Sequence, residues 1–224
     1  MGGLIPLSDA SRRPSHAPVV TIGIILANVC VFVLELRRGD PFVLHWSAVP
    51  AQIIAGHRWI TGLTSMFLHA SWSHILGNMI FLWAFGPEIE DRMNPFRYAA
   101  FYLCGGMAAL LAQIGANPTS TVPNLGASGA IAAVMGAFLV AYPRDRIRSI
   151  LIIFLYIRIT FVPAILLIGF WFLIQLLDAG AVSAVHPGGV AYVAHVAGFV
   201  FGALTVRLFD DPRRIRTGLL SDTR

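Results

Sequence analysis

Residues 123–142, PNLGASGAIAAVMGAFLVAY, contain the change from a polar loop to an apolar helix that decides the fold. The change falls at Ser128, which stands between Ala127 and Gly129, and the run that follows is uncharged as far as Arg144. A serine at a helix start among small residues can cap the helix, pack closely against a neighbour or act as a nucleophile. The rest of the chain bears on which of these interpretations holds.

The composition of the chain is that of a membrane protein. Of its 224 residues 57% are hydrophobic and 12% are charged, with a mean hydropathy of +0.74, whereas soluble domains carry about 25% charged residues. The net charge of +5 comes from arginines in short segments between apolar runs, which indicates membrane orientation and not nucleic-acid binding. The two cysteines lack CxxC spacing, so neither a disulfide scaffold nor a metal site is indicated.

Six apolar runs predict an all-α membrane protein, a bundle of six transmembrane helices. Runs that approach about 20 residues are expected to cross the bilayer as helices, because unpaired backbone groups are costly in lipid. Arginines gather before the first run, between the second and third, between the fourth and fifth, and after the sixth, so both termini are predicted to be cytoplasmic. The runs cover residues 18–36, 74–87, 96–115, 128–142, 163–178 and 190–209. The expected parts are a cytoplasmic segment at 1–17, the six-helix domain at 18–209 and a cytoplasmic tail at 210–224.

Two connecting segments are predicted to lie along the membrane surface. Residues 37–63 contain Trp46 and Trp59 among apolar residues, which is typical of a structured outer loop at the interface. Residues 148–160 are apolar but carry Arg158 near their centre, and a charge there would be costly in hydrocarbon. We therefore expect this second segment at the cytoplasmic interface.

Polar residues from three of the runs are predicted to lie at one depth. Depth is counted from the charged residue that follows each run, at about 1.5 Å per residue, and gives roughly 24 Å for Ser128 and roughly 18 Å for His195. The same count gives roughly 21 Å for His74 and roughly 15 Å for Asn78, which share one helical face. In a core of about 30 Å these four groups form one polar layer near the midplane.

A serine beside a histidine is the smallest activated nucleophile, because imidazole can remove the hydroxyl proton and return it to the leaving amine. Gly198 and Gly202 continue a small-residue packing face from His195, and the small residues after Ser128 offer a matching surface, which would bring the two side chains together. The Ser128 backbone N–H at a helix start, with the side chains of His74 and Asn78, could stabilise an oxyanion. We expect a dyad without a carboxylate.

Three motifs resemble those of the rhomboid intramembrane serine proteases, and the resemblance covers about residues 18–209. H-x-x-x-N falls at 74–78, G-x-S-G at 126–129 and A-H-x-x-G-x-x-x-G at 194–202. The resemblance implies that Ser128 is the nucleophile and His195 the base, and that the Ser128 amide, His74 and Asn78 form the oxyanion site. Structural roles are implied for Gly126, Gly129, Gly198 and Gly202.

The resemblance also implies two features outside the dyad and shows one departure. Glu90 and Arg92 match an E-x-R pattern, implied to be a structural ion pair at the cytoplasmic end of the second helix. The fifth helix and the loop after it, about 163–190, are implied to admit substrate. Ala132 stands where some members carry an aromatic residue that stacks on the histidine. The residues that could hold His195 in its place are Tyr192, Trp171 and Phe172.

The predicted function is therefore an intramembrane serine endopeptidase that cleaves transmembrane segments through an acyl-enzyme, without metal or organic cofactor. Its partners are expected to be transmembrane protein substrates and the lipid bilayer, not nucleic acid. A bacterial inner membrane is expected from the short termini and the family's compact six-span form. The alternatives are a non-catalytic rhomboid-like protein that binds client transmembrane helices and a small-molecule transporter, since polar groups near the midplane are also typical of transport sites.

Overall fold

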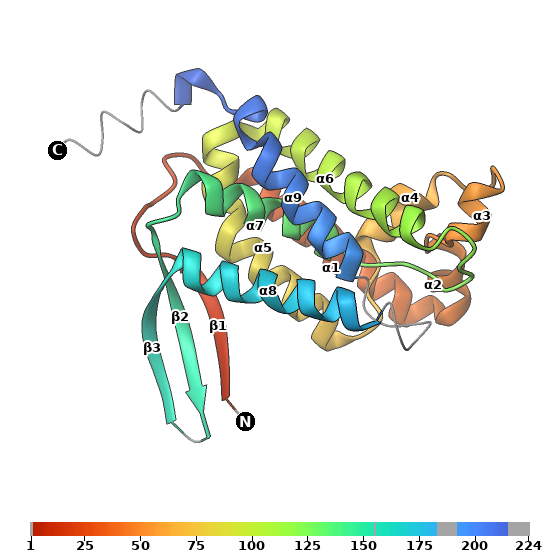
Figure 1. The fold of residues 1–224 in the computed structure, drawn as a ribbon, viewed down its shortest axis with the longest axis horizontal. Coiled ribbons are helices and arrows are strands. Elements are labelled where there is room, and N and C mark those ends of the chain that lie inside the picture. Colours follow the sequence, from red (N-terminus) through yellow and green to blue (C-terminus); the bar gives the residue numbers. More distant parts are fainter. Residues whose placement is uncertain (1, 155, 183–191, 215–224) are drawn as a thin grey trace.

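The computed structural model describes residues 2–154, 156–182 and 192–214, which form a bundle of six long helices with short helices at one end and a small sheet beside it (Figure 1). The long helices are α1 (Val19–Arg38), α5 (Trp72–Met93), α6 (Pro95–Ala116), α7 (Ser128–Ala141), α8 (Ala164–Val182) and α9 (Tyr192–Phe209). The short ones are α2 (Asp40–Trp46), α3 (Pro50–Ile54), α4 (Thr61–Thr64) and the 3₁₀ turn η1 (Ser65–Phe67). The strands are β1 (Gly2–Asp9), β2 (Arg146–Ile153) and β3 (Tyr156–Pro163).

Each of the six apolar runs corresponds to one long helix. By length and composition α1, α6 and α9 can each cross a membrane, while α7 and the apolar part of α8 are shorter apolar helices. The outer surface fits lipid, since large apolar side chains such as Leu26 and Val29 on α1 and Phe170 and Leu177 on α8 are 42–66% exposed. The six-crossing topology stays a prediction.

Helix α7 lies at the centre of the bundle and contacts α5, α6, α8 and α9. Residues 130–138 of this helix are all buried. A helix that is apolar on every side is stable only where neighbours surround it. The apolar run after Ser128 therefore forms the core of the fold and places its first turn inside the bundle.

The segment just before α1 and the segment just after α9 both contact the end of the bundle formed by the α5–α6 connection. The backbone N–H groups of Ser15 and His16 donate to the carboxylate of Asp91, at 2.9 and 3.1 Å. The N–H of Asp211 donates to the carbonyl oxygen of Arg92 at 3.2 Å. Both segments thus lie at the same end of the bundle, and their assignment to the cytoplasm stays a prediction.

The expectation of an all-α fold is wrong in one respect, because the chain contains a three-stranded antiparallel sheet of order β1-β2-β3. The segment predicted to follow the membrane surface forms β2 and β3, in register from Arg146↔Pro163 to Ile153↔Tyr156. Its β-branched residues favour a strand over a helix because their side chains are stiff at χ1. Strand β1 comes from the predicted N-terminal segment and pairs with β2.

The sheet extends from the bundle beside α5 and α8 (Figure 1). It encloses an apolar cavity of about 530 Å³ with these two helices, lined among others by Leu4 of β1, Phe81 of α5 and Trp171 of α8. Strand β3 leads directly into α8 at Ala164, so the sheet anchors the beginning of that helix.

Candidate active site

Ser128 occupies the first helical position of α7, after a loop that is held in place by backbone hydrogen bonds. Asn124 exchanges backbone hydrogen bonds with Ala48, and the N–H of Gly126 donates to the carbonyl oxygen of Ser65 at 2.9 Å. Gly126 has a φ of +127°, and a Cβ on this residue would lie 2.9 Å from ring atoms of His74. The turn that presents Ser128 therefore requires glycine at this position.

His195 is brought to Ser128 by the close packing of α9 on α7. A Cβ on Gly198 would overlap the carbonyl oxygen of Gly129, and one on Gly202 would overlap that of Ala133. The backbones can approach this closely only because these positions lack side chains. The structure places Gly198 and Gly202 on the face of α9 that packs against α7, as their spacing predicts.

The structure places Ser128 and His195 within hydrogen-bond distance. Ser128 Oγ lies 2.7 Å from His195 Nε2, and His195 is only 9% exposed. Both line a cavity of about 610 Å³ together with His74 and Asn78, so all four residues predicted for the site meet in one place. This is the geometry in which an imidazole can accept the serine proton.

His74 and Asn78 are held by neighbours in orientations suited to donating hydrogen bonds. His74 Nδ1 accepts from the backbone N–H of Ala70 at 3.4 Å, which leaves Nε2 as the protonated nitrogen on the side of Gly126. Asn78 Nδ2 donates to His69 Nε2 at 2.9 Å and retains a second N–H for the cavity. His69 is 2% exposed and supports the site through this contact.

Gln175 on α8 contacts the other nitrogen of His195, and sequence reasoning missed it. Its Oε1 lies 2.6 Å from Nδ1 of the imidazole. Of the predicted aromatic alternatives, Trp171 and Tyr192 have ring centroids 6.0 and 6.4 Å from that of the His195 ring, and neither is stacked on it. The signal in the sequence was an amide in an apolar run, three positions before Asp178.

The prediction that Glu90 and Arg92 pair with each other is wrong. The Glu90 carboxylate accepts from the backbone N–H groups of Val20 and Thr21, each at 2.8 Å, and thereby satisfies the first turn of α1. Arg92 makes a two-pronged contact with the Asp210 carboxylate. Residues two apart on a helix point in different directions, so each side chain serves a different neighbour.

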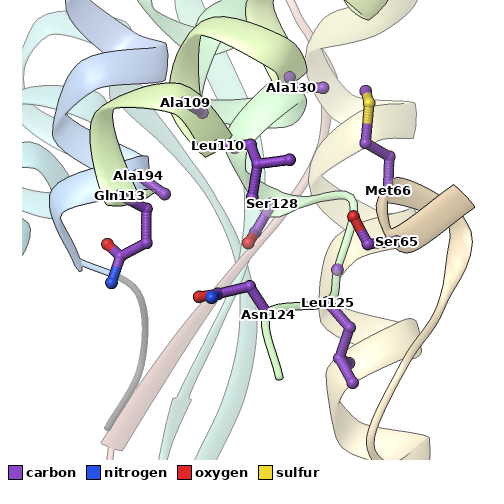
Figure 2. A pocket seen from close by; sticks show the side chains of 13 residues that line it. Ser65, Met66, Ala109, Leu110, Gln113, Asn124, Leu125, Ser128, Ala130 and Ala194 are labelled. Atoms are coloured by element: carbon purple, nitrogen blue, oxygen red, sulfur yellow. The ribbon is translucent and has the colours of Figure 1, made fainter. Parts of the chain in front are cut away.

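A second, smaller pocket of about 50 Å³ lies against Ser128 (Figure 2). Figure 2 shows the side chain of Asn124 close to the Ser128 hydroxyl, with Gln113 on one side of Ser128 and Ser65 on the other. Gln113 Oε1 is buried without a hydrogen-bond partner among the described residues. The pocket exceeds the space that one water needs, and the polar groups of Ser65, Gln113 and Asn124 in its otherwise apolar lining could bind one.

These features define a class: a helical membrane protein with a serine–histidine pair in a polar cavity, beside donors that suit an oxyanion. Comparison with known families gives a match to the Rhomboid domain over residues 56–210. The chain belongs to the rhomboid family.

Curated relatives of this chain include named proteases and a rhomboid-like protein. The human protein "Presenilin-associated rhomboid-like protein, mitochondrial" is 34% identical over 150 residues, 64% of this chain and 36% of that protein. "Rhomboid protease GluP" of Bacillus subtilis is 28% identical over 144 residues, 59% of this chain and 28% of that protein. "Rhomboid protease GlpG" of Yersinia pestis is 28% identical over 125 residues, 54% and 43%. The chain thus matches between about a quarter and under half of the length of these relatives.

Proposed function

We propose that this chain is an intramembrane serine endopeptidase that cleaves transmembrane segments of other membrane proteins. The observation that carries the proposal is the 2.7 Å contact between Ser128 Oγ and His195 Nε2 inside the cavity. The same cavity is lined by His74 and Asn78, whose side chains can donate hydrogen bonds. A serine that served only for packing would need neither the histidine nor these hydrogen-bond donors.

In the proposed reaction Ser128 Oγ attacks the carbonyl carbon of a substrate peptide bond while Nε2 of His195 takes the hydroxyl proton. The tetrahedral intermediate collapses when the C–N bond breaks, and the imidazolium gives its proton to the departing amine. Water then attacks the acyl-enzyme with the same histidine as base. The second product leaves as a carboxylic acid, and Ser128 recovers its proton.

The developing oxyanion is proposed to lie between the start of α7 and the side chains of α5. The first N–H groups of a helix have no intrahelical acceptor, so the Ser128 amide is free to donate. Nε2–H of His74 and the second N–H of Asn78 come from α5, whose residues line the same cavity. Donors fixed before the reaction, away from bulk water, stabilise the charge that appears in the transition state.

Substrate helices are proposed to reach this site from the side, past α8. The apolar cavity beside the sheet and the cavity around Ser128 share Phe81 and Trp171 in their linings, which gives an apolar approach to the polar site. A helix hides its carbonyl groups in its own hydrogen bonds, so it must unwind locally before Ser128 can attack. Of the implied entry segment, residues 183–190 lie outside the described residues.

The protein is an integral membrane protein. The domain limits at 18 and 209 and a bacterial inner membrane remain predictions, and the relatives include mitochondrial proteins as well as bacterial ones.

Purified protein in detergent tests the proposal with a fluorogenic transmembrane peptide and a fluorophosphonate probe. We expect the wild type to cleave the peptide and take up the probe, and Ser128→Ala to do neither. His195→Ala should lose both activities by a large factor, because the serine then lacks its base.

The control is Ser65→Ala, which changes a hydroxyl in the neighbouring pocket while Ser128 stays intact. Equal cleavage or labelling by the wild type and Ser128→Ala would exclude Ser128 as the nucleophile. A folded wild type that binds the peptide without cleaving it would favour the non-catalytic alternative.

A further inference from the structure

We infer that Gln175 is a positioning residue for His195 and forms, with Ser128, a linear serine–histidine–glutamine arrangement across three helices. The inference rests on the proposed function of the dyad. The Nδ1–H of the imidazole donates to Gln175 Oε1 at 2.6 Å, while Nε2 faces Ser128 at 2.7 Å. Gln175 therefore acts through the histidine.

The chemistry of the dyad requires an acceptor at Nδ1. A neutral imidazole carries one proton, and Nε2 must be free of it to accept from Ser128. An acceptor at Nδ1 selects the tautomer with the proton on that side. The amide oxygen of Gln175 supplies this acceptor, and it also receives a charge-assisted hydrogen bond when the ring becomes an imidazolium.

The amide suits its surroundings better than a carboxylate would. Gln175 is 8% exposed on an apolar helix, where an ionised side chain would be costly. An amide oxygen orients the ring without adding a buried charge. Third members of such arrangements in soluble proteases include asparagine as well as aspartate, so an amide is chemically sufficient.

The contact between α8 and α9 fixes the reach of the amide. Phe172 stacks on Phe199 with ring centroids 4.1 Å apart and planes at 21°. Phe172 lies three residues before Gln175, and Phe199 lies four residues after His195, so both pairs meet on the same helical faces. The ring stack therefore holds the two helices at the spacing that the hydrogen bond needs.

Ala132 explains why the histidine needs a partner from α8. This alanine is fully buried one turn after Ser128, so α7 offers no aromatic ring to the imidazole. The ring contacts of His195 within the described residues are tilted or edge-on, from Trp171 and Tyr192. Such contacts restrict the ring less than a directional hydrogen bond does, and they select neither tautomer.

The test compares Gln175→Met, which keeps length without an acceptor, with Gln175→Glu, which keeps an acceptor at the same reach. Leu176→Met on the lipid-facing side of α8 is the matched control, since Leu176 is 44% exposed. We expect Gln175→Met to lower kcat for the transmembrane peptide about 10- to 100-fold, the loss of one charge-assisted hydrogen bond, with KM little changed. Gln175→Glu should retain most of the activity that Gln175→Met loses.

The second readout is independent of turnover. In protein with ¹⁵N-labelled histidine, the His195 signal is identified by its loss in His195→Ala, and its shifts report which ring nitrogen is protonated. We expect protonated Nδ1 in the wild type and Gln175→Glu, and a mixture of tautomers in Gln175→Met. Wild-type kcat together with an unchanged tautomer in folded Gln175→Met would overturn the inference. If the wild type itself neither cleaves nor labels, the proposed function fails, and the tautomer measurement still decides the role of Gln175.

Discussion

Ser128 combines the roles that its sequence context left open. It begins α7, the carbonyl oxygen of its neighbour Gly129 lies against Gly198 of α9, and its hydroxyl faces His195. These roles depend on one another, because the hydroxyl can reach the imidazole only where the two backbones are close. Packing and chemistry at this residue are consequences of the same small side chains.

Gly202 offers a test of that dependence two turns away from the histidine. We expect Gly202→Ala to destabilise the protein by about 1–3 kcal/mol, because the added methyl group would overlap the carbonyl oxygen of Ala133. Thermal unfolding in detergent measures the change. Gly23→Ala on α1 is the control, since a Cβ there would have no atom within 4 Å. Equal melting temperatures for the two variants would contradict the packing argument.

The residues of the site were predictable where a charged residue marked the depth of a helix. Ser128, His195, His74 and Asn78 all lie on runs that end in such a residue, and all four line one cavity. Gln175 was missed because an uncharged amide in an apolar run resembles a residue that joins helices. Its contact with His195 depends on α8 lying beside α9, which the sequence does not show.

At the scale of elements, the sheet carries large apolar side chains that are exposed. On β3, Ile157, Ile159 and Phe161 point to one face and are 68, 50 and 53% exposed. Large apolar patches on a protein surface mark contact with another apolar phase. We expect this face to lie in the interfacial region of the bilayer.

A spin label measures that position. Ile159→Cys is introduced after Cys30 and Cys104 are changed to serine, and the label is expected to collide more with oxygen, which enters lipid, than with a water-soluble nickel chelate. Arg144→Cys, in the exposed connection before β2, is the control and should show the opposite preference. A label at position 159 that prefers the nickel chelate would place the sheet in water.

The sheet itself could not be predicted from the apolar pattern alone. Residues 157–161 of β3 alternate between apolar and polar, but residues 150–153 of β2 are a continuous apolar run, and a short run of this kind is consistent with either a strand or a buried helix. Strand β1 adds a pairing between Gly2 and Ile153, two residues far apart in the chain. The long helices, in contrast, follow from the apolar runs, which for α1, α6 and α9 are long enough to cross a membrane.

For the whole molecule, polar groups gather near the end of the bundle at which the segment before α1 and the segment after α9 contact the α5–α6 connection. Arg12 Nε donates to the Asp145 carboxylate at 2.6 Å, and Asp9 lies close to the same carboxylate. Burial, with a smaller contribution from Asp145, raises the pKa of Asp9 from 3.8 to about 6. The folded protein therefore binds a proton at Asp9 more readily than the unfolded chain does.

This shift predicts how stability changes with pH. The stability that the folded protein gains from the neutral Asp9 side chain is fully present below about pH 3.8. It is lost as the pH rises through about 6, because the carboxylate must then ionise where it is buried. Asp9→Asn should raise the unfolding free energy at pH 8 by up to about 3 kcal/mol and have little effect at pH 4. Unfolding in detergent across this range, with the exposed Asp40→Asn as control, measures it. A gain that is equal at both pH values would contradict the assignment.

The pairing of β1 with β2 also sets an order on the making of the protein. During synthesis β1 leaves the ribosome before its partner β2, which follows only after α1, α5, α6 and α7. Strand β1 therefore stays unpaired while these helices insert into the membrane. Closing so long a loop is slow. Because β3 runs directly into α8, the sheet and the helix that carries Gln175 are completed together. Because α9, which carries His195, follows α8 in the chain, the proposed arrangement of Ser128, His195 and Gln175 can be completed only after strands β2 and β3 have been made.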